Sequence, residues 1–357
     1  MHIALAFNLR KEPDGEQDQP PSEPSGEPPS EPPSPAEDRY AEWDDIHTIR
    51  AVETALSRRH HVSLVEADYH AFGSFQTLRP QLVFNIAEGL LGNSRESQIP
   101  AMLDMLGIPY TGSDPVTLGL CLDKRRTKEI LSYHGVPTPW FVVVGSLAEV
   151  PSRLRYPLMV KPTLEGSSKG VTDRSLVRNR RELLRQVDWV LHTYNQPALI
   201  EEFLPGREFT VALLGNGNEV RILPVVEINF DTLPSGVNPI YSYEAKWIWD
   251  REEDPLQIFT CPARLDPALE QEIGTLCRKA FKILGCRDWC RIDVRLDARG
   301  APHVIELNPL PGILPRPEQN SCFPKAARAA GISYEELILG VAEAAGRRLG
   351  LCAGEDR

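Results

Sequence analysis

The sequence lacks the segments expected of a membrane-spanning or exported protein. None of its 357 residues belongs to an apolar run approaching the roughly 20 residues needed to cross a bilayer. The opening segment Met-His-Ile-Ala-Leu-Ala-Phe has neither the basic region nor the cleavage-site pattern of a secretory signal. We therefore expect a cytoplasmic protein that has no membrane partner.

Closely spaced cysteine pairs and an excess of basic residues are also missing. The seven cysteines include no Cys-x-x-Cys pair, which argues against a disulfide framework and a zinc site. The net charge of −11 comes mostly from residues 12–38, which carry nine acidic and no basic residues. The rest of the chain is nearly balanced in charge and shows no basic stripe, so nucleic acid is not expected as a partner.

Residues 12–38 differ in composition from the rest of the chain. They contain nine prolines and almost no apolar side chains, which predicts a disordered insert. Beyond it, short apolar runs alternate with helical patterns, as is typical of an α/β fold. We expect a first domain over 1–122, a mostly antiparallel module over 123–205, a third region over 206–345 and a tail over 346–357.

A predicted hairpin carries the most informative polar residues. Residues 290–296 alternate between polar and apolar side chains, residues 297–300 form a turn, and residues 302–308 return as a second strand. This register brings Asp293 close to Glu306 and Asn308. Two carboxylates and an amide oxygen suit Mg²⁺, although an exposed hairpin with one solvated acidic face explains these residues alone equally well.

Two further features favour a phosphate-binding site. Lys161 ends an apolar run, and a lysine at the end of a buried strand is costly unless it meets an anion. The loop that follows, Glu-Gly-Ser-Ser-Lys-Gly over 165–170, offers backbone N–H groups and hydroxyls to phosphate oxygens. Glu88 follows the predicted strand 82–85, at the sheet edge where open α/β sheets bind ligands.

Several ordered stretches together resemble the D-alanine–D-alanine ligase family. They are residues 107–113, 123–124, 160–162, 165–168, 199–210, 243–246, 285–293 and 306–312. The resemblance implies a Rossmann-like N-terminal domain followed by a two-lobed ATP-grasp module. It also implies an ATP-dependent and Mg²⁺-dependent (or Mn²⁺-dependent) ligase that joins amino-acid or carboxylate substrates, and it favours a homodimer.

The resemblance assigns roles residue by residue. It implies that nucleotide contacts come from Lys124, Lys161, Glu165, Ser167, Ser168, Glu201, Glu202, Phe203, Leu204, Glu208 and Lys246. It implies metal binding by Asp293, Glu306 and Asn308. It implies that catalysis depends on Arg291, Gly312, Ser167 and Lys246, with Arg291 and the Gly312 N–H stabilising a tetrahedral intermediate.

Two departures from the family pattern concern the substrates, and a third concerns a contact of the phosphate lid. The glutamate loop that holds the first substrate's amino group is replaced here, and Glu42 or Asp44 could substitute. Residues 313–324 form a longer, different segment, in which Arg316 could pair with a carboxylate. Trp247 stands where a tyrosine is usual. The altered segments leave two other interpretations open, a ligase of specialised metabolism with a different acceptor and a non-catalytic nucleotide-binding regulator.

Overall fold

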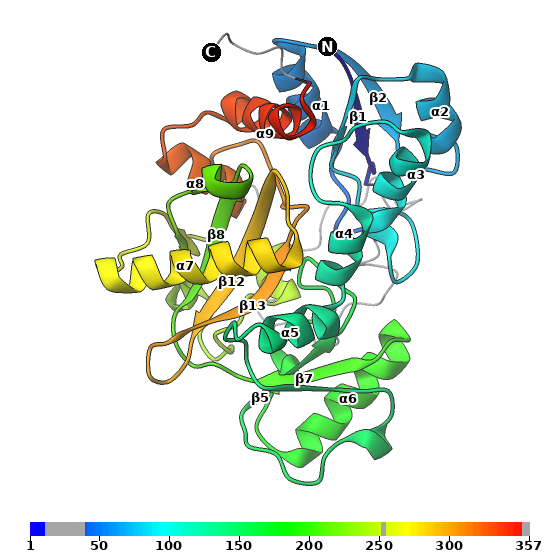
Figure 1. The fold of residues 1–357 in the computed structure, drawn as a ribbon. Coiled ribbons are helices and arrows are strands. Elements are labelled where there is room, and N and C mark those ends of the chain that lie inside the picture. The colour runs from blue at the N-terminus through cyan, green and yellow to red at the C-terminus, as the bar shows by residue number, and fades with distance from the viewer. Residues whose placement is uncertain (11–39, 251–254, 352–357) are drawn as a thin grey trace, which may run out of the picture.

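The computed structural model describes residues 1–10, 40–250 and 255–351, so the predicted disordered insert at 12–38 lies outside the described part of the chain. Within that part, no helix is both long and apolar enough to cross a membrane. Three separate sheets are flanked by helices (Figure 1). The predicted α/β class is confirmed.

The N-terminal domain is built on a parallel sheet with strand order β2-β1-β3. Its elements are β1 (His2–Phe7), α1 (Ile46–Ser57), β2 (His61–Glu66), α2 (Ala71–Leu78), β3 (Leu82–Asn85), α3 (Gln98–Leu106) and α4 (Pro115–Leu122). Alternate residues of β1 pack on opposite faces of the sheet, Leu5 toward α1 and Ala6 toward α2 and α3. β3 is buried throughout and ends at the loop that carries Glu88.

The central lobe is a four-stranded antiparallel sheet of order β4-β7-β5-β6. It comprises β4 (Phe141–Val144), β5 (Leu158–Pro162), β6 (Leu176–Val177), α6 (Arg180–Tyr194) and β7 (Ala198–Glu202). Val160 and Ile200 pack against α6, so the alternation along each strand turns Lys161 and Glu201 to the opposite face. Two charged residues therefore lie on the face that α6 leaves uncovered.

The C-terminal lobe contains a six-stranded antiparallel sheet. Its elements are β8 (Glu208–Leu214), β9 (Arg221–Ile222), β10 (Val226–Ile228), β11 (Phe259–Thr260), α7 (Pro267–Leu284), β12 (Trp289–Leu296), β13 (Pro302–Asn308), α8 (Cys322–Ala329) and α9 (Tyr334–Leu349). α7 covers one face of β8, β12 and β13, and α5 (Lys124–Tyr133) packs against α7 and β13. The predicted hairpin is confirmed as β12 and β13, with Asp293 directly opposite Glu306.

The last helix returns to the N-terminal domain, where α9 lies beside α1 (Figure 1). The predicted tail beginning at 346 is wrong for its first residues, because α9 continues to Leu349. Arg348 explains this extension, since its guanidinium group lies 2.7 Å from the fully buried carboxylate of Asp288. Asp288 also accepts a hydrogen bond from the Gly112 N–H, so one carboxylate joins α9, the C-terminal lobe and the N-terminal domain.

Candidate active site

Two adjoining clefts gather the functional residues predicted from the sequence. The inter-sheet cleft lies between the central sheet and the C-terminal sheet, and the interdomain cleft lies between the N-terminal domain and the C-terminal lobe. All of the predicted nucleotide contacts line the inter-sheet cleft: Lys124, Lys161, Glu165, Ser167, Ser168, Glu201, Glu202, Phe203, Leu204, Glu208 and Lys246. Gly312 and Asn308 line the interdomain cleft, and Arg291 and Glu306 line both.

A buried ion-pair network forms one wall of the inter-sheet cleft. Glu201 lies 2.7 Å from the ammonium group of Lys161 and 2.8 Å from that of Lys128. Burial opposes ionisation of Glu201, but the two lysines outweigh it and hold its pKa at about 2. Glu201 in turn raises the pKa of Lys161 against the effect of burial. Burial lowers the pKa of Lys128, and Glu201 opposes this effect, so the same carboxylate favours the charged form of both lysines.

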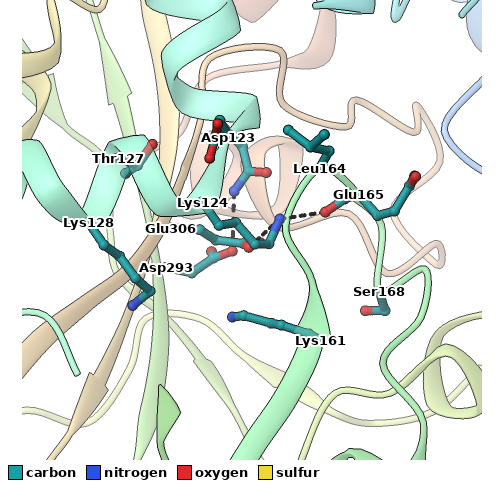
Figure 2. A network of polar contacts seen from close by, with 12 residues as sticks. Asp123, Lys124, Thr127, Lys128, Lys161, Leu164, Glu165, Ser168, Asp293 and Glu306 are labelled. Atoms are coloured by element: carbon teal, nitrogen blue, oxygen red, sulfur yellow. Dashed lines mark hydrogen bonds and ion pairs between the residues drawn. The ribbon is translucent and has the colours of Figure 1, made fainter. Parts of the chain in front are cut away.

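The hairpin residues lie at the junction of the two clefts. Lys124 contacts the backbone carbonyl of Glu165 and lies 3.3 Å from Glu306 (Figure 2). Asp293 accepts hydrogen bonds from Arg291, and its Oδ2 lies 3.3 Å from the Asn308 amide nitrogen. Burial raises the pKa of Glu306, but Lys124, Lys161 and Arg291 outweigh this effect and leave the carboxylate ionised. Hard anionic oxygens and cations therefore share one small region.

The donor set fits a hard divalent cation. Among the described residues, no group of three or more His, Cys, Asp or Glu side chains converges as a metal site. The predicted set instead has two carboxylates, from Asp293 and Glu306, and the amide of Asn308. Mg²⁺ typically takes one or two protein carboxylates and completes its shell with phosphates and water, so this smaller set suits Mg²⁺ bound together with a phosphate ligand.

The loop over 165–170 covers the inter-sheet cleft in a constrained conformation. Ser167 and Ser168 both have positive φ, at 50° and 61°, which is costly for residues with a side chain and needs support from neighbours. Lys246 donates to the Ser167 hydroxyl, and the Trp247 indole N–H donates to the Ser167 carbonyl. Trp247, found where a tyrosine is usual, therefore contacts this loop directly. Both support residues belong to a six-residue π-helix, Glu244–Trp249, a local geometry that is frequent at functional sites.

Glu42 holds the same loop from the N-terminal domain. Its carboxylate accepts hydrogen bonds of 2.8 Å from the Gly166 N–H and from Arg95, and it lies 3.3 Å from Lys169. Burial raises the pKa of Glu42, but Arg95 and Lys169 outweigh it and hold the pKa at about 2. Of the two sequence candidates for binding an amino group, Glu42 is therefore already paired. The side chain of Asp44 makes no hydrogen bond or ion pair among the described residues and interacts with Arg10 only electrostatically.

The far end of the inter-sheet cleft is aromatic. Glu208 lies 2.7 Å from Arg295, whose guanidinium group stacks over the rings of Phe203 and Phe230 at 4.6 and 5.1 Å. Leu204 and Met159 line the same cleft. A flat apolar surface beside a carboxylate acceptor suits a heterocyclic base attached to a sugar.

The altered segment after Gly312 begins at the edge of the interdomain cleft, which Ile313 lines. The hydroxyl of Ser321 donates to the Gly312 carbonyl at 2.9 Å and accepts from the Leu314 N–H, which fixes the backbone around Gly312. Arg316 is exposed and lies on a separate pocket with Trp247 and Asn320. Arg316 therefore lies outside the cleft that holds Arg291 and Gly312.

Comparisons with known proteins identify relatives of this chain. The family model described as D-ala D-ala ligase C-terminus matches residues 141–343. A D-alanine–D-alanine ligase of Bordetella petrii is 36% identical over 79% of this chain and 83% of its own length. The chain belongs to the D-alanine–D-alanine ligase family. Membership makes it an ATP-dependent ligase that forms an amide bond, as the sequence predicted.

Other similar proteins extend the comparison. The D-alanine–D-alanine ligase of Haemophilus influenzae is 39% identical over 73% of this chain and 82% of its own length. An uncharacterized protein, y4sG of Sinorhizobium fredii, is 39% identical over 75% of each chain. A crystal structure of the Bacillus anthracis D-alanine–D-alanine ligase complexed with ATP superposes with a TM-score of 0.70 at 21% identity, covering 98% of this chain and 99% of that one. The predicted arrangement of a Rossmann-like domain before an ATP-grasp module is thereby confirmed.

Sequence reasoning missed three residues of the site. Lys128 sits in α5, where a lysine in the pattern Lys-Arg-Arg-Thr-Lys-Glu suggests a solvated helix face, yet it is fully buried. Arg95 binds Glu42 across 53 positions, which no local pattern indicates. Glu96 is 9% exposed and lines the interdomain cleft. Its proximity to Glu88 in sequence is the one signal that could have found it.

Proposed function

We propose that this ligase transfers the γ-phosphoryl group of ATP to the carboxylate of one amino acid and joins the resulting acyl phosphate to the amine of a second substrate. In the first step a carboxylate oxygen bonds to phosphorus and ADP leaves. In the second step the amine attacks the acyl carbon, inorganic phosphate leaves and the amine loses a proton. The observation that carries the proposal is the meeting of Lys124, Lys161 and Glu306 where the two clefts join.

We assign the phosphate end of the inter-sheet cleft to Lys124, Lys161 and Lys246. The ammonium groups neutralise charge on the transferring phosphoryl group, and positioning with charge neutralisation is most of what such a transfer needs. Asp293, Glu306 and Asn308 would hold Mg²⁺ or Mn²⁺, which when bound neutralises phosphate oxygens. Ser167 and Ser168, with Glu165, would close the loop over the phosphates.

We assign the adenine base and the ribose of ATP to the aromatic end of the inter-sheet cleft. Glu201 and Glu202 precede Phe203 and Leu204 in the segment proposed to line the adenine, and Glu208 is proposed to accept hydrogen bonds from the ribose hydroxyls. Because Glu201 binds Lys161 and Lys128, we infer that its carboxylate acts by holding the lysines charged. Adenine recognition would then fall to the backbone and apolar side chains of the segment.

Arg291 and the Gly312 N–H are proposed to stabilise the tetrahedral intermediate of the second step. Both line the interdomain cleft, where the acyl phosphate would meet the amine. Arg291 and Gly312 would be needed only for the second chemical step. Their presence therefore disfavours the interpretation of the chain as a non-catalytic regulator. A homodimer stays a prediction from the family resemblance, and a cytoplasmic location stays a prediction from the sequence pattern.

The test is phosphate release from Mg-ATP with D- and L-amino acids, singly and in pairs, with mass spectrometry of the products. The proposal expects phosphate release that depends on an amino-acid pair, together with a dipeptide. Release with D-alanine alone would assign the activity named for the relatives, and release with another pair would favour a ligase with a different acceptor. ATP binding without phosphate release under every pair would reject the proposal.

A further inference from the structure

The N-terminal wall of the interdomain cleft is acidic. Four carboxylates reach it from three segments: Glu42 and Asp44 before α1, Glu88 after β3, and Glu96 before α3. The opposite wall carries Arg291 and the turn that ends at Gly312. Lys124, Glu165 and Glu306 line both clefts, so the acidic wall lies close to the proposed site of phosphoryl transfer.

Among the described residues, no cation lies within ion-pair distance of three of these four carboxylates. Arg10 acts electrostatically on Asp44, and Arg95 acts on Glu88 and Glu96 from further away. Glu42 is neutralised by Arg95 and Lys169, as described above. Within the described ranges, the side chains of Asp44, Glu88 and Glu96 make no hydrogen bond or ion pair. Glu96 is 91% buried and still faces the cleft. A buried carboxylate left unpaired is costly, so this wall calls for positive charge from a ligand.

The carboxylates also repel one another. Burial and the neighbouring Glu42 raise the pKa of Glu96 to about 7, although Arg95 opposes this. Burial, with Glu96 and Glu42, raises the pKa of Glu88 well above its usual range. Without a ligand these crowded carboxylates thus favour their protonated forms, and a bound cation would favour their ionised forms and donate charge-assisted hydrogen bonds to them.

We propose that the interdomain cleft selects a basic amino acid, in which an α-ammonium group and a second ammonium or guanidinium group face Asp44, Glu88 and Glu96. This inference rests on the proposed ligase function, because it places the substrate carboxylate between Arg291 and Lys124, next to the phosphates. One ammonium group can balance only one of the three carboxylates. With a neutral side chain two carboxylates would gain no cation, whereas a basic side chain pairs with one of them and favours its ionised form.

Calorimetric binding in the presence of Mg²⁺ and a non-hydrolysable ATP analogue tests the inference. Lysine, ornithine and arginine of both configurations are compared with norleucine, which has the length of lysine but no side-chain charge, and with alanine. We expect at least one basic amino acid to bind about tenfold more tightly than norleucine or better, as charge-assisted hydrogen bonds would provide. Equal or tighter binding of norleucine or alanine, or no binding of any amino acid, would overturn the inference.

Substitutions in the acidic wall test which carboxylates cause the preference for a basic amino acid. Glu96→Gln and Glu88→Gln should each reduce the preference for the basic amino acid about tenfold and leave norleucine binding unchanged. Glu219→Gln removes the same charge from a side chain that is 77% exposed and should leave the preference intact. An unchanged preference in both cleft variants would also overturn the inference. If the variants fail to fold, the comparison of lysine with norleucine binding in the unmodified protein still tests the inference.

Measuring phosphate release beside amino-acid binding distinguishes a failure of this inference from a failure of the proposed ligase function. Selective binding of a basic amino acid without phosphate release under any pair would support the acidic cleft and reject the ligase proposal. Phosphate release with a dipeptide from alanine, but with no preference for basic amino acids, would support the ligase proposal and reject the acidic cleft.

Discussion

The ammonium group of Lys128, fully buried in α5, lies 2.8 Å from the carboxylate of Glu201 in β7. α5 packs against the C-terminal lobe, whereas β7 belongs to the central sheet. This ion pair therefore joins the two lobes that enclose the inter-sheet cleft. It also sets the environment of Lys161, which shares the same carboxylate.

Replacing Lys128 with methionine should destabilise the protein. The substitution keeps the length of the side chain but leaves Glu201 with one cationic partner instead of two. Breaking a buried pair typically costs about 3–5 kcal/mol, and the remaining contact with Lys161 should reduce this to about 2 kcal/mol. Urea denaturation measures the change, with the exposed Lys282→Met as a control. A loss below about 0.5 kcal/mol would contradict the role given to the pair.

Glu306→Gln should abolish turnover while leaving the fold intact. The substitution preserves side-chain volume but removes the charge that faces Lys124 and the proposed metal position. We expect kcat to fall by about 100-fold or more, with the thermal midpoint changed by only a few degrees. Steady-state phosphate release and thermal unfolding measure the two quantities. Near-normal kcat in this variant would remove the metal assignment.

Glu42→Gln should loosen the loop over 165–170. The neutral amide keeps one acceptor for the Gly166 N–H but loses its ion pairs with Arg95 and Lys169. Hydrogen exchange at residues 165–170 should become faster, while exchange in α6 stays unchanged. KM for ATP should rise about tenfold, because the loop closes over the phosphates. Unchanged exchange would show that Trp247 and Lys246 suffice to hold the loop.

Deleting residues 12–38 should leave the thermal midpoint within a few degrees of the full chain. The composition of this segment predicts disorder, and long surface insertions add little to loop-closure entropy. The deletion must retain Glu42, since that carboxylate holds the loop over the inter-sheet cleft. A large fall in the midpoint would show that the deleted segment packs against the folded body.

The sequence could predict those parts of the site that depend on local patterns. The alternation over 290–308 predicted the hairpin and the pairing of Asp293 with Glu306, since two strands joined by a short turn have little freedom of register. The loop at 165–170 was recognisable by its glycine and serine content. Contacts that depend on the packing of distant elements were not predictable, because no local periodicity encodes them.

Lys128 and Glu96 illustrate this limit. Lys128 is buried because the central lobe supplies Glu201 from 73 positions further along the chain. Glu96 faces the cleft because the turn before α3 packs against α4, which a helical pattern does not reveal. α9 shows the same effect at the C-terminal end, where the contact of Arg348 with Asp288 extends the helix beyond the predicted boundary. Charged residues at lobe and domain junctions are thus the ones that sequence patterns most readily misassign to the surface.

The pH dependence of activity offers a test of Lys246. Burial, together with the nearby Arg291 guanidinium group, lowers the pKa of Lys246 to about 8. A lysine that neutralises phosphate must be protonated, so its contribution is present below pH 8 and is lost as the pH rises through that value. We expect kcat/KM for ATP, which reports the free enzyme, to fall on the alkaline side near pH 8. Lys246→Arg should move that limb to higher pH, because a guanidinium group stays charged there. An alkaline limb that stays in place in Lys246→Arg would assign the titration to another group.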